Sequence, residues 1–288
     1  MILVASCREE PVTCIPDISC SNSVACGIEG KLQWTLCADS VLYISGAGKM
    51  SDYWVAPDES ADRLAGWYEH KDSIFSIIIG NDVTSIGDYA FLNFENLTSV
   101  TIGNSVTVIG NRAFMASGLT SVTIPESVTE IGKGAFGGCI DLRSVSIPNS
   151  VTKIGEGAFY NCRYITSIDI PNLVTKIAPY TFYDCGRLTS VVIPDLVTEI
   201  GEGAFTDCRN MTSVTIGSSL KTIDNWAFTD CIDLTEFINY SATPQVISDR
   251  VFLGVHPAKC TLFVPAGSET AYRNAEGWEY FENIQAIE

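Results

Sequence analysis

The segment "VTEIGKGAFGGC" (Val128–Cys139) returns almost unchanged as "VTKIGEGAFYNC" from Val151 and as "VTEIGEGAFTDC" from Val197. Aligning the chain on the phenylalanine of this segment gives eight copies at steps of 22 to 24 residues: Phe91, Phe114, Phe136, Phe159, Phe182, Phe205, Phe228 and Phe252. A fixed period in the twenties, with apolar residues at matching positions, is typical of a solenoid in which each repeat forms one coil. The segment therefore predicts a stack of similar coils.

Each repeat contains two stretches that alternate between apolar and polar residues. In "SVTI" (213–216) valine and isoleucine alternate with hydroxyl residues, and "VTEI" (197–200) shows the same spacing, so both stretches predict short strands. The pattern "GxxAFxxC" places Ala, Phe and Cys on one side and predicts one helical turn after a glycine bend. The fold class expected is therefore a β-rich α/β repeat solenoid, whose coils must stack because a single coil cannot cover its own two flat sides.

Five of the 11 cysteines follow the repeat, whereas six follow no period. The periodic cysteines, at steps of 23 residues, are Cys139, Cys162, Cys185, Cys208 and Cys231. Neighbouring coils lie close enough for disulfides, but the same position holds Phe94, Ser117 and Val255, which indicates a packed side chain and predicts buried free thiols. A zinc site is not expected, because no histidine accompanies the thiols and they would lie in a line.

The remaining cysteines suggest disulfide chemistry near the N-terminus. The residues outside the period are Cys7, Cys14, Cys20, Cys26, Cys37 and Cys260. In an exported protein at least one bridge is expected among Cys14, Cys20, Cys26 and Cys37, which allow three pairings that the sequence leaves open. Cys260 stays a further candidate for this set.

The charge of the chain bears on its partners. The formal net charge is −17, from 34 acidic and 17 basic residues, so the mean field repels phosphate backbones and a nucleic-acid partner is not expected. The chain contains no run of 18 apolar residues, so no membrane-spanning helix is expected. Val4–Cys7 ("VASC") is similar to a bacterial lipobox, which makes Cys7 a candidate lipid anchor; the alternative is that the match is accidental within a leader.

The repeats resemble the BspA-like leucine-rich repeats, a family of 23-residue coils found in surface proteins of oral and gut bacteria and of some protists. The resemblance rests on "LTSVTIPESVTEIGKGAFGGC" (119–139) and its copies up to about Asn239. It implies a right-handed stack of coils, adhesion or recognition at the outer surface of a bacterial cell, and no shared catalytic residues.

The segments that flank the repeats are similar to the caps of such arrays. The expected organisation is a leader or lipoprotein anchor and linker at 1–25, an N-terminal β cap at 26–72, the repeat array at 73–240, and the last repeat with a C-terminal α/β cap at 241–288. "LQWTL" and "VLYI" (32–36 and 41–44) pattern as a hairpin. At the other end a helix is expected from Ser268 to Asn274, and Trp278, Phe281 and Ile284 are expected to seal the last coil.

No catalytic, cofactor or metal site is expected. The two histidines, His70 and His256, are far apart in a rod-like fold, and no HExxH, GxSxG, P-loop or dinucleotide motif occurs. The outward strand positions are rich in serine and threonine, which indicates either a soluble strand surface or a shallow polar recognition surface for protein or glycan.

Departures from the repeat supply the candidate binding residues. Tyrosines and arginines gather in two adjacent repeats, as in a protein interface, although the rings could merely lean on the turn surface. The candidates are Tyr160, Tyr164, Tyr180, Tyr183, Arg163 and Arg187. A second group, Trp54, Trp67 and Tyr68, is interpreted either as a platform for sugar rings or as core.

The function expected is a non-enzymatic, monomeric cell-surface or secreted protein that binds a partner protein through the solenoid surface. The alternatives are a glycan-binding surface lipoprotein for polysaccharide capture and a structural spacer without a ligand of its own. Contact with a membrane is expected only through the lipid anchor.

Overall fold

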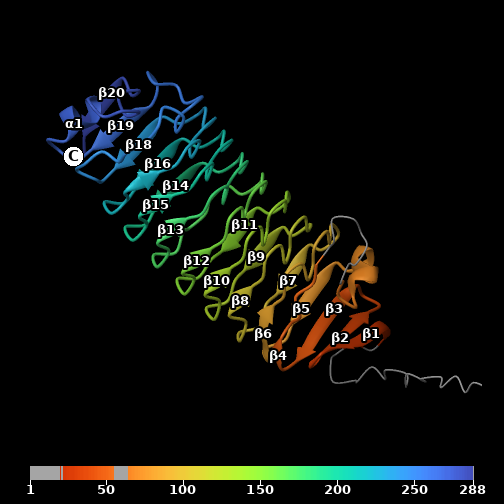
Figure 1. Ribbon diagram of the computed structural model, residues 1–288. Helices are drawn as coiled ribbons and strands as arrows, with labels where there is room; N and C mark the ends of the chain where they lie inside the picture. The colour runs from red at the N-terminus through yellow and green to blue at the C-terminus, as the bar shows by residue number, and fades with distance from the viewer. Residues whose placement is uncertain (1–19, 21, 55–63, 288) are drawn as a thin grey trace, which may run out of the picture.

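The computed structural model describes residues 20, 22–54 and 64–287 and shows the solenoid expected from the repeats. In Figure 1 the coils form one elongated stack, with β1 (Ser23–Glu29) near one end and α1 (Glu269–Arg273) near the other. Within the described residues the only helices are α1 and the 3-10 helix η1 (Tyr68–Ser73), so the molecule is a β-solenoid with little helix.

All but one of the described coils contribute one strand to a parallel main ladder along the stack. Its strands are β5 (Ser76–Ile79), β7 (Ser99–Thr101), β9 (Ser121–Thr123), β11 (Ser144–Ser146), β14 (Ser190–Ile193), β16 (Ser213–Ile216), β18 (Glu236–Asn239), β19 (Thr261–Val264) and β20 (Asn283–Ala286). The pairs join equivalent residues of successive coils, such as Val191 with Val214. Residues 167–170, which are equivalent to these strands, form no strand, so the main ladder is interrupted between β11 and β14. It is also divided between β7 and β9, which belong to different sheets.

A second set of short strands follows the turn after each main strand. It comprises β4 (Gly48–Lys49), β6 (Val83–Ile86), β8 (Val108–Ile109), β10 (Glu130–Ile131), β12 (Lys153–Ile154), β13 (Lys176–Ile177), β15 (Glu199–Ile200) and β17 (Thr222–Ile223). These strands also pair in parallel, in two sheets that separate between β12 and β13. Each coil therefore has two extended sides that point alternate side chains into the interior.

The two ends of the stack are covered as the sequence predicted. At the N-terminal end β2 (Leu32–Cys37) pairs antiparallel with β3 (Val41–Gly46), and β1 pairs with β2. At the C-terminal end Ser268 precedes α1 without a side-chain capping bond, while Trp278, Phe281 and Ile284 are buried. Covering the last coil removes its apolar cross-section from water.

The turn that carries the phenylalanine is not the helical turn expected from the sequence. Gly157 and Asn161 take φ values of +59° and +57°, which a right-handed helix cannot contain. Alternate amides instead donate to the following coil at 2.7 to 3.0 Å, with the pairs Gly157 to Pro179, Phe159 to Thr181 and Asn161 to Tyr183. This phenylalanine turn (residues 155–162 and its equivalents) is therefore a third line of backbone hydrogen bonds along the stack.

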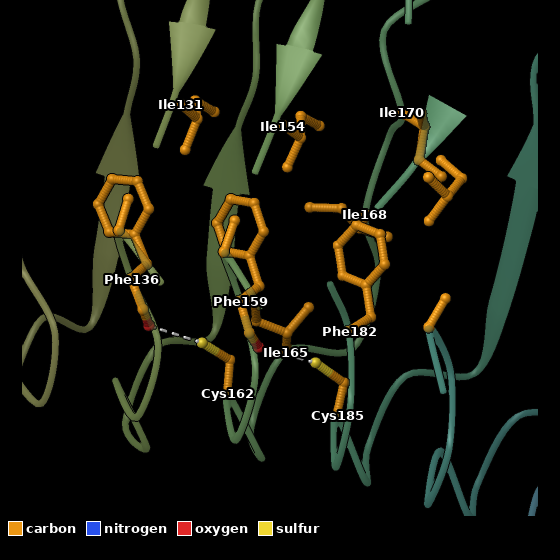
Figure 2. Close-up of a cluster of buried hydrophobic side chains, with 14 of the residues drawn as sticks. Ile131, Phe136, Ile154, Phe159, Cys162, Ile165, Ile168, Ile170, Phe182 and Cys185 are labelled. Atoms are coloured by element: carbon orange, nitrogen blue, oxygen red, sulfur yellow. Dashed lines mark hydrogen bonds between the residues drawn. The ribbon is translucent and has the colours of Figure 1, made fainter. Parts of the chain in front are cut away.

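The phenylalanines form a continuous stack through the interior. Successive rings from Phe91 to Phe252 have centroids 5.1 to 5.9 Å apart and lie within 21° of parallel. Figure 2 shows three of these rings, Phe136, Phe159 and Phe182, in a row on successive coils. Trp67 continues the stack at the N-terminal end, 5.7 Å from Phe91. The successive coils therefore share one elongated core.

The periodic cysteines are buried free thiols, which confirms the prediction. Each thiol lies 3.1 to 3.3 Å from the carbonyl oxygen of the phenylalanine in the preceding coil and donates to it, as Cys162 does to Phe136 (Figure 2). Burial raises the pKa of the Cys139 thiol to about 11, so the thiolate is disfavoured at neutral pH. The position is therefore structural.

The cysteines outside the period divide into bonded and free residues. Cys20 and Cys37 form a disulfide, and Cys26 is also disulfide-bonded, which confirms the expectation of at least one bridge near the N-terminus. Cys260 is free and buried, so its inclusion among the disulfide candidates was wrong. It lies just before β19, inside the core.

Replacing Phe159 by alanine tests the shared core. Removal of a fully buried ring from the middle of the stack should lower the free energy of unfolding by about 3–5 kcal/mol, measured by urea denaturation followed by circular dichroism. The exposed Ser144→Ala on β11 serves as the control and should change the free energy by less than about 0.5 kcal/mol. Equal effects of the two substitutions would contradict a continuous core.

Candidate functional site

Three of the candidate tyrosines meet in one hollow. The tyrosine hollow lies on the surface formed by the phenylalanine turns and has a volume of about 510 Å³. Its lining includes Tyr160, Tyr180 and Tyr183, together with Arg112 and Met115 from earlier coils. This volume falls within the range of pockets that hold a small molecule or an anchoring side chain.

The hollow exists because one position of the repeat keeps its backbone conformation but varies in its side chain. Two residues before the phenylalanine, the chain takes the left-handed conformation in seven coils, with φ between 52° and 60°: Tyr89, Arg112, Gly134, Gly157, Tyr180, Gly203 and Trp226. Glycine adopts this conformation without strain, whereas bulky residues do so at a cost. Gly134 and Gly157 are consecutive, so two neighbouring coils lack a side chain there, between Arg112 and Tyr180.

Tyr160 provides the floor of this gap. A Cβ atom added to Gly137 would lie 2.2 Å from Cε1 of Tyr160, and one added to Gly157 would lie 3.2 Å from Cδ1 of the same residue. The Tyr160 ring therefore leans back over the preceding coil, where only glycine leaves room for it. Burial raises the pKa of the Tyr160 hydroxyl, partly offset by the nearby positive charge of Arg112, so the phenol is neutral at physiological pH.

The walls of the hollow are held by contacts outside it. On the N-terminal side the Arg112 guanidinium lies 5.4 Å from the Tyr89 ring centroid and donates a hydrogen bond to the Tyr89 hydroxyl. On the C-terminal side the Tyr180 hydroxyl donates to a carboxylate oxygen of Glu202. The rings of Tyr180 and Tyr183 meet edge to face at 6.2 Å. These contacts fix the walls before any ligand arrives.

The rim carries charges of both signs. Lys133 and Glu156, which come from adjacent coils, form an ion pair at 2.7 Å between the ammonium and a carboxylate oxygen. The hydrogen bond from Tyr180 to the Glu202 carboxylate, with burial, raises the pKa of Tyr180 to about 12. The site thus offers phenol hydroxyls, aromatic faces and one stacked guanidinium, which are groups suited to binding.

The other three candidate residues do not line the tyrosine hollow. The Tyr164 ring lies between two guanidinium groups, those of Arg143 at 5.2 Å and Arg187 at 4.5 Å from its centroid. Arg163 forms an ion pair with Asp184 at 2.8 Å. Proximity in sequence had suggested one cluster, but the structure divides it into the hollow and a separate Arg–Tyr–Arg stack.

The N-terminal aromatic group is mostly core. Trp67 is fully buried, and its indole N–H donates to the carbonyl of Ala90 at 3.0 Å, so it offers no platform for sugar rings. Tyr68 is partly buried and packs edge to face on Phe94 at 6.0 Å. Trp54 is 47% exposed. The core interpretation of this group is thus confirmed for Trp67.

Three further expectations concern a lipid anchor, a metal site and a membrane-spanning helix. The candidate lipid anchor Cys7 lies outside the described residues. Among the residues that the structure describes, no three His, Cys, Asp or Glu side chains are placed to hold a metal ion, and no helix is long and apolar enough to cross a membrane.

The sequence pointed to the tyrosines but missed the residues that make room for them. Arg112 and the glycines at 134, 137 and 157 carry the shape of the hollow. Arg112, Gly134 and Gly157 share one position of the repeat, two residues before the phenylalanine, which changes between glycine and large side chains; Gly137 directly follows Phe136.

Comparisons with known proteins bear on the family and the fold. A family model described as "BspA type Leucine rich repeat region" matches residues 65–186 and 175–262, in six copies. A solved leucine-rich repeat protein of T. pallidum is 24% identical, with a TM-score of 0.52, over 79% of this chain and 88% of that chain. One from Bacteroides ovatus is 21% identical, with a TM-score of 0.47, over 92% of this chain and 89% of that chain. No curated protein matches the chain significantly.

Glu202→Gln tests the hydrogen bond that fixes the wall of the hollow. Loss of the carboxylate removes both a strong acceptor and a negative charge, so the pKa of Tyr180 should fall from about 12 towards the ordinary tyrosine value of about 10. Ultraviolet titration of the phenolate, with Tyr180→Phe to assign the transition, measures this change. An unchanged titration would contradict the contact.

Proposed function

The chain belongs to the BspA-type leucine-rich repeat family, and on that premise we propose that it is a non-enzymatic recognition protein of a bacterial cell surface. It binds a partner protein through the tyrosine hollow. The observation that carries this proposal is the convergence of Tyr160, Tyr180 and Tyr183 with Arg112 on one hollow of about 510 Å³.

The composition of the hollow supports binding to a protein. Tyrosine and arginine are enriched among the residues that dominate binding energies, because they bury a large area and still form hydrogen bonds. In this site the rings and the guanidinium are already held by Tyr89 and Glu202. Little side-chain freedom is therefore lost on binding, which favours affinity.

The non-enzymatic and surface assignments rest on the sequence and the family. The sequence contains no recognised catalytic motif. The BspA-type resemblance implies recognition at the outer surface of a bacterium. The "VASC" segment supports lipid attachment at Cys7 as the means of retention there.

Single substitutions of the tyrosines test the binding site. Tyr160→Ala and Tyr183→Ala should each weaken binding at least about tenfold, because loss of an interface anchor costs more than about 1.4 kcal/mol. Biolayer interferometry against purified extracellular-matrix and epithelial surface proteins measures the dissociation constants. Val246→Ala, at an exposed residue outside the hollow, serves as the control and should leave binding unchanged.

Two results of this experiment would contradict the proposal. One is the absence of binding to every protein of the panel by the unsubstituted chain. The other is binding that survives both tyrosine substitutions while circular dichroism shows both variants folded.

The anchor is tested by metabolic labelling in a bacterial host that processes lipoproteins. The chain, expressed from its own gene, should incorporate a labelled fatty acid, and Cys7→Ala should abolish the label, because the lipid is attached through the cysteine sulfur. Cys14→Ala is the matched control and should remain labelled. Equal labelling of both variants, or of neither, would count against Cys7.

A further inference from the structure

Two adjoining hollows lie along the main ladder, away from the tyrosine hollow. They have volumes of about 350 and 520 Å³ and share Asn172, Val192 and Pro194 in their linings. Together they extend across successive coils from Asn149 to Tyr240. We define the pair as the strand groove, and we propose that it binds a neutral oligosaccharide. This site is independent of the protein-binding hollow.

The strand groove begins where the main ladder is interrupted. Residues 165–170 keep the apolar alternation of a strand, with Ile168 and Ile170 buried, but form no ladder pairs. Within the described chain no backbone hydrogen bond joins residues 167–170 to β11 or β14. The segment thus lies in the stack without strand pairing, and its exposed residues Ser167 and Asp169 line the smaller hollow.

The polar side chains of the strand groove suit a hydroxylated and uncharged ligand. The hydroxyl and amide groups suited to such a ligand are those of Asn149, Ser167, Asn172, Ser190, Thr215 and Ser218. The charged residues among the described lining are Asp169 and Asp195, and neither hollow is lined by a described Lys or Arg. Two carboxylates in a chain of net charge −17 repel phosphate, sulfate and uronate groups. Anionic polymers are thereby disfavoured.

Exposed apolar groups lie among these polar groups. Val192 is 63% exposed on β14, at an outward position that holds a hydroxyl residue in four other coils: Thr101, Thr123, Ser146 and Thr215. Tyr240 is 48% exposed at the far end of the groove. A pyranose ring presents hydroxyls at its edge and C–H groups on its face, so it matches polar groups that alternate with a ring and a methyl surface.

The spacing of the coils favours a linear polymer over a folded partner. Paired parallel strands lie about 4.8 Å apart, so equivalent side chains recur at a distance comparable to the length of one sugar unit. Each coil can therefore present similar groups to successive units of a chain. Among the described lining residues, Tyr240 is the one aromatic anchor, and no Trp or Arg of the kind that dominates protein interfaces is present. A cationic peptide, attracted by Asp169 and Asp195, is the competing ligand.

Affinity electrophoresis through gels that contain soluble neutral polysaccharides tests the proposal. The probes are a β-glucan, a mannan and an arabinoxylan, with polygalacturonate as the anionic comparison. The chain should be retarded by at least one neutral polymer and not by polygalacturonate. Asn172→Ala and Tyr240→Ala should each weaken the retardation about tenfold or more, because each removes a contact in the groove.

The controls separate this site from other surfaces. Thr101→Ala, on β7 in the same ladder but outside both hollows, should be retarded like the unsubstituted chain. The substituted side chains of Asn172 and Tyr240 are exposed, and circular dichroism verifies that both variants fold. If one variant unfolds, the other still decides the result.

Three outcomes would overturn the proposal. The first is no retardation by any of the three neutral polymers. The second is retardation that the folded variants keep in full. The third is binding of oligolysine, measured by isothermal titration calorimetry, without retardation by a neutral polymer, which would assign the groove to a cationic peptide. Loss of protein binding in the Tyr160 variant has no bearing on these outcomes.

Discussion

The in-register stacking of the phenylalanine turns is the constraint on which the rest of the structure depends. Rings 5.1 to 5.9 Å apart from Phe91 to Phe252 and backbone amides such as that of Phe159, which donates to the next coil, hold successive coils at one spacing. This line of contacts continues where the strand ladders are interrupted between β12 and β13. The stack can therefore tolerate irregular strands without losing its common core.

The same constraint explains why glycine is required at some positions and only permitted at others. A Cβ atom at Gly155 would lie 2.5 Å from the backbone nitrogen of Lys133, so close stacking there excludes side chains. Two residues further on, the left-handed position faces outward, and Tyr180 occupies it at φ 55°. Variation at that outward column changes the surface without altering the core. The tyrosine hollow is a product of this freedom.

The two proposed sites use different consequences of the repeat. In the tyrosine hollow, large side chains from several coils lean towards a gap left by glycine. Along the strand groove, similar small polar groups recur from coil to coil, and the missing strand at residues 165–170 opens the ladder. A stack of like coils can thus present both a distinct pocket and a periodic surface on different sides.

The sequence by itself determined the coil length, the inward columns and the burial of free thiols such as Cys162, because periodic apolar residues report which side of a strand faces the interior. It also identified Tyr160, Tyr180 and Tyr183. Only the tertiary structure decided that the phenylalanine turn is a ladder rather than a helical turn, and that Tyr164 and Arg187 lie apart from the hollow. The physical reason is that the direction in which a side chain points along the stack depends on the space that the side chains of adjacent coils leave free. Tyr160 leans backwards because Gly137 has no side chain, and that contact joins residues 23 positions apart.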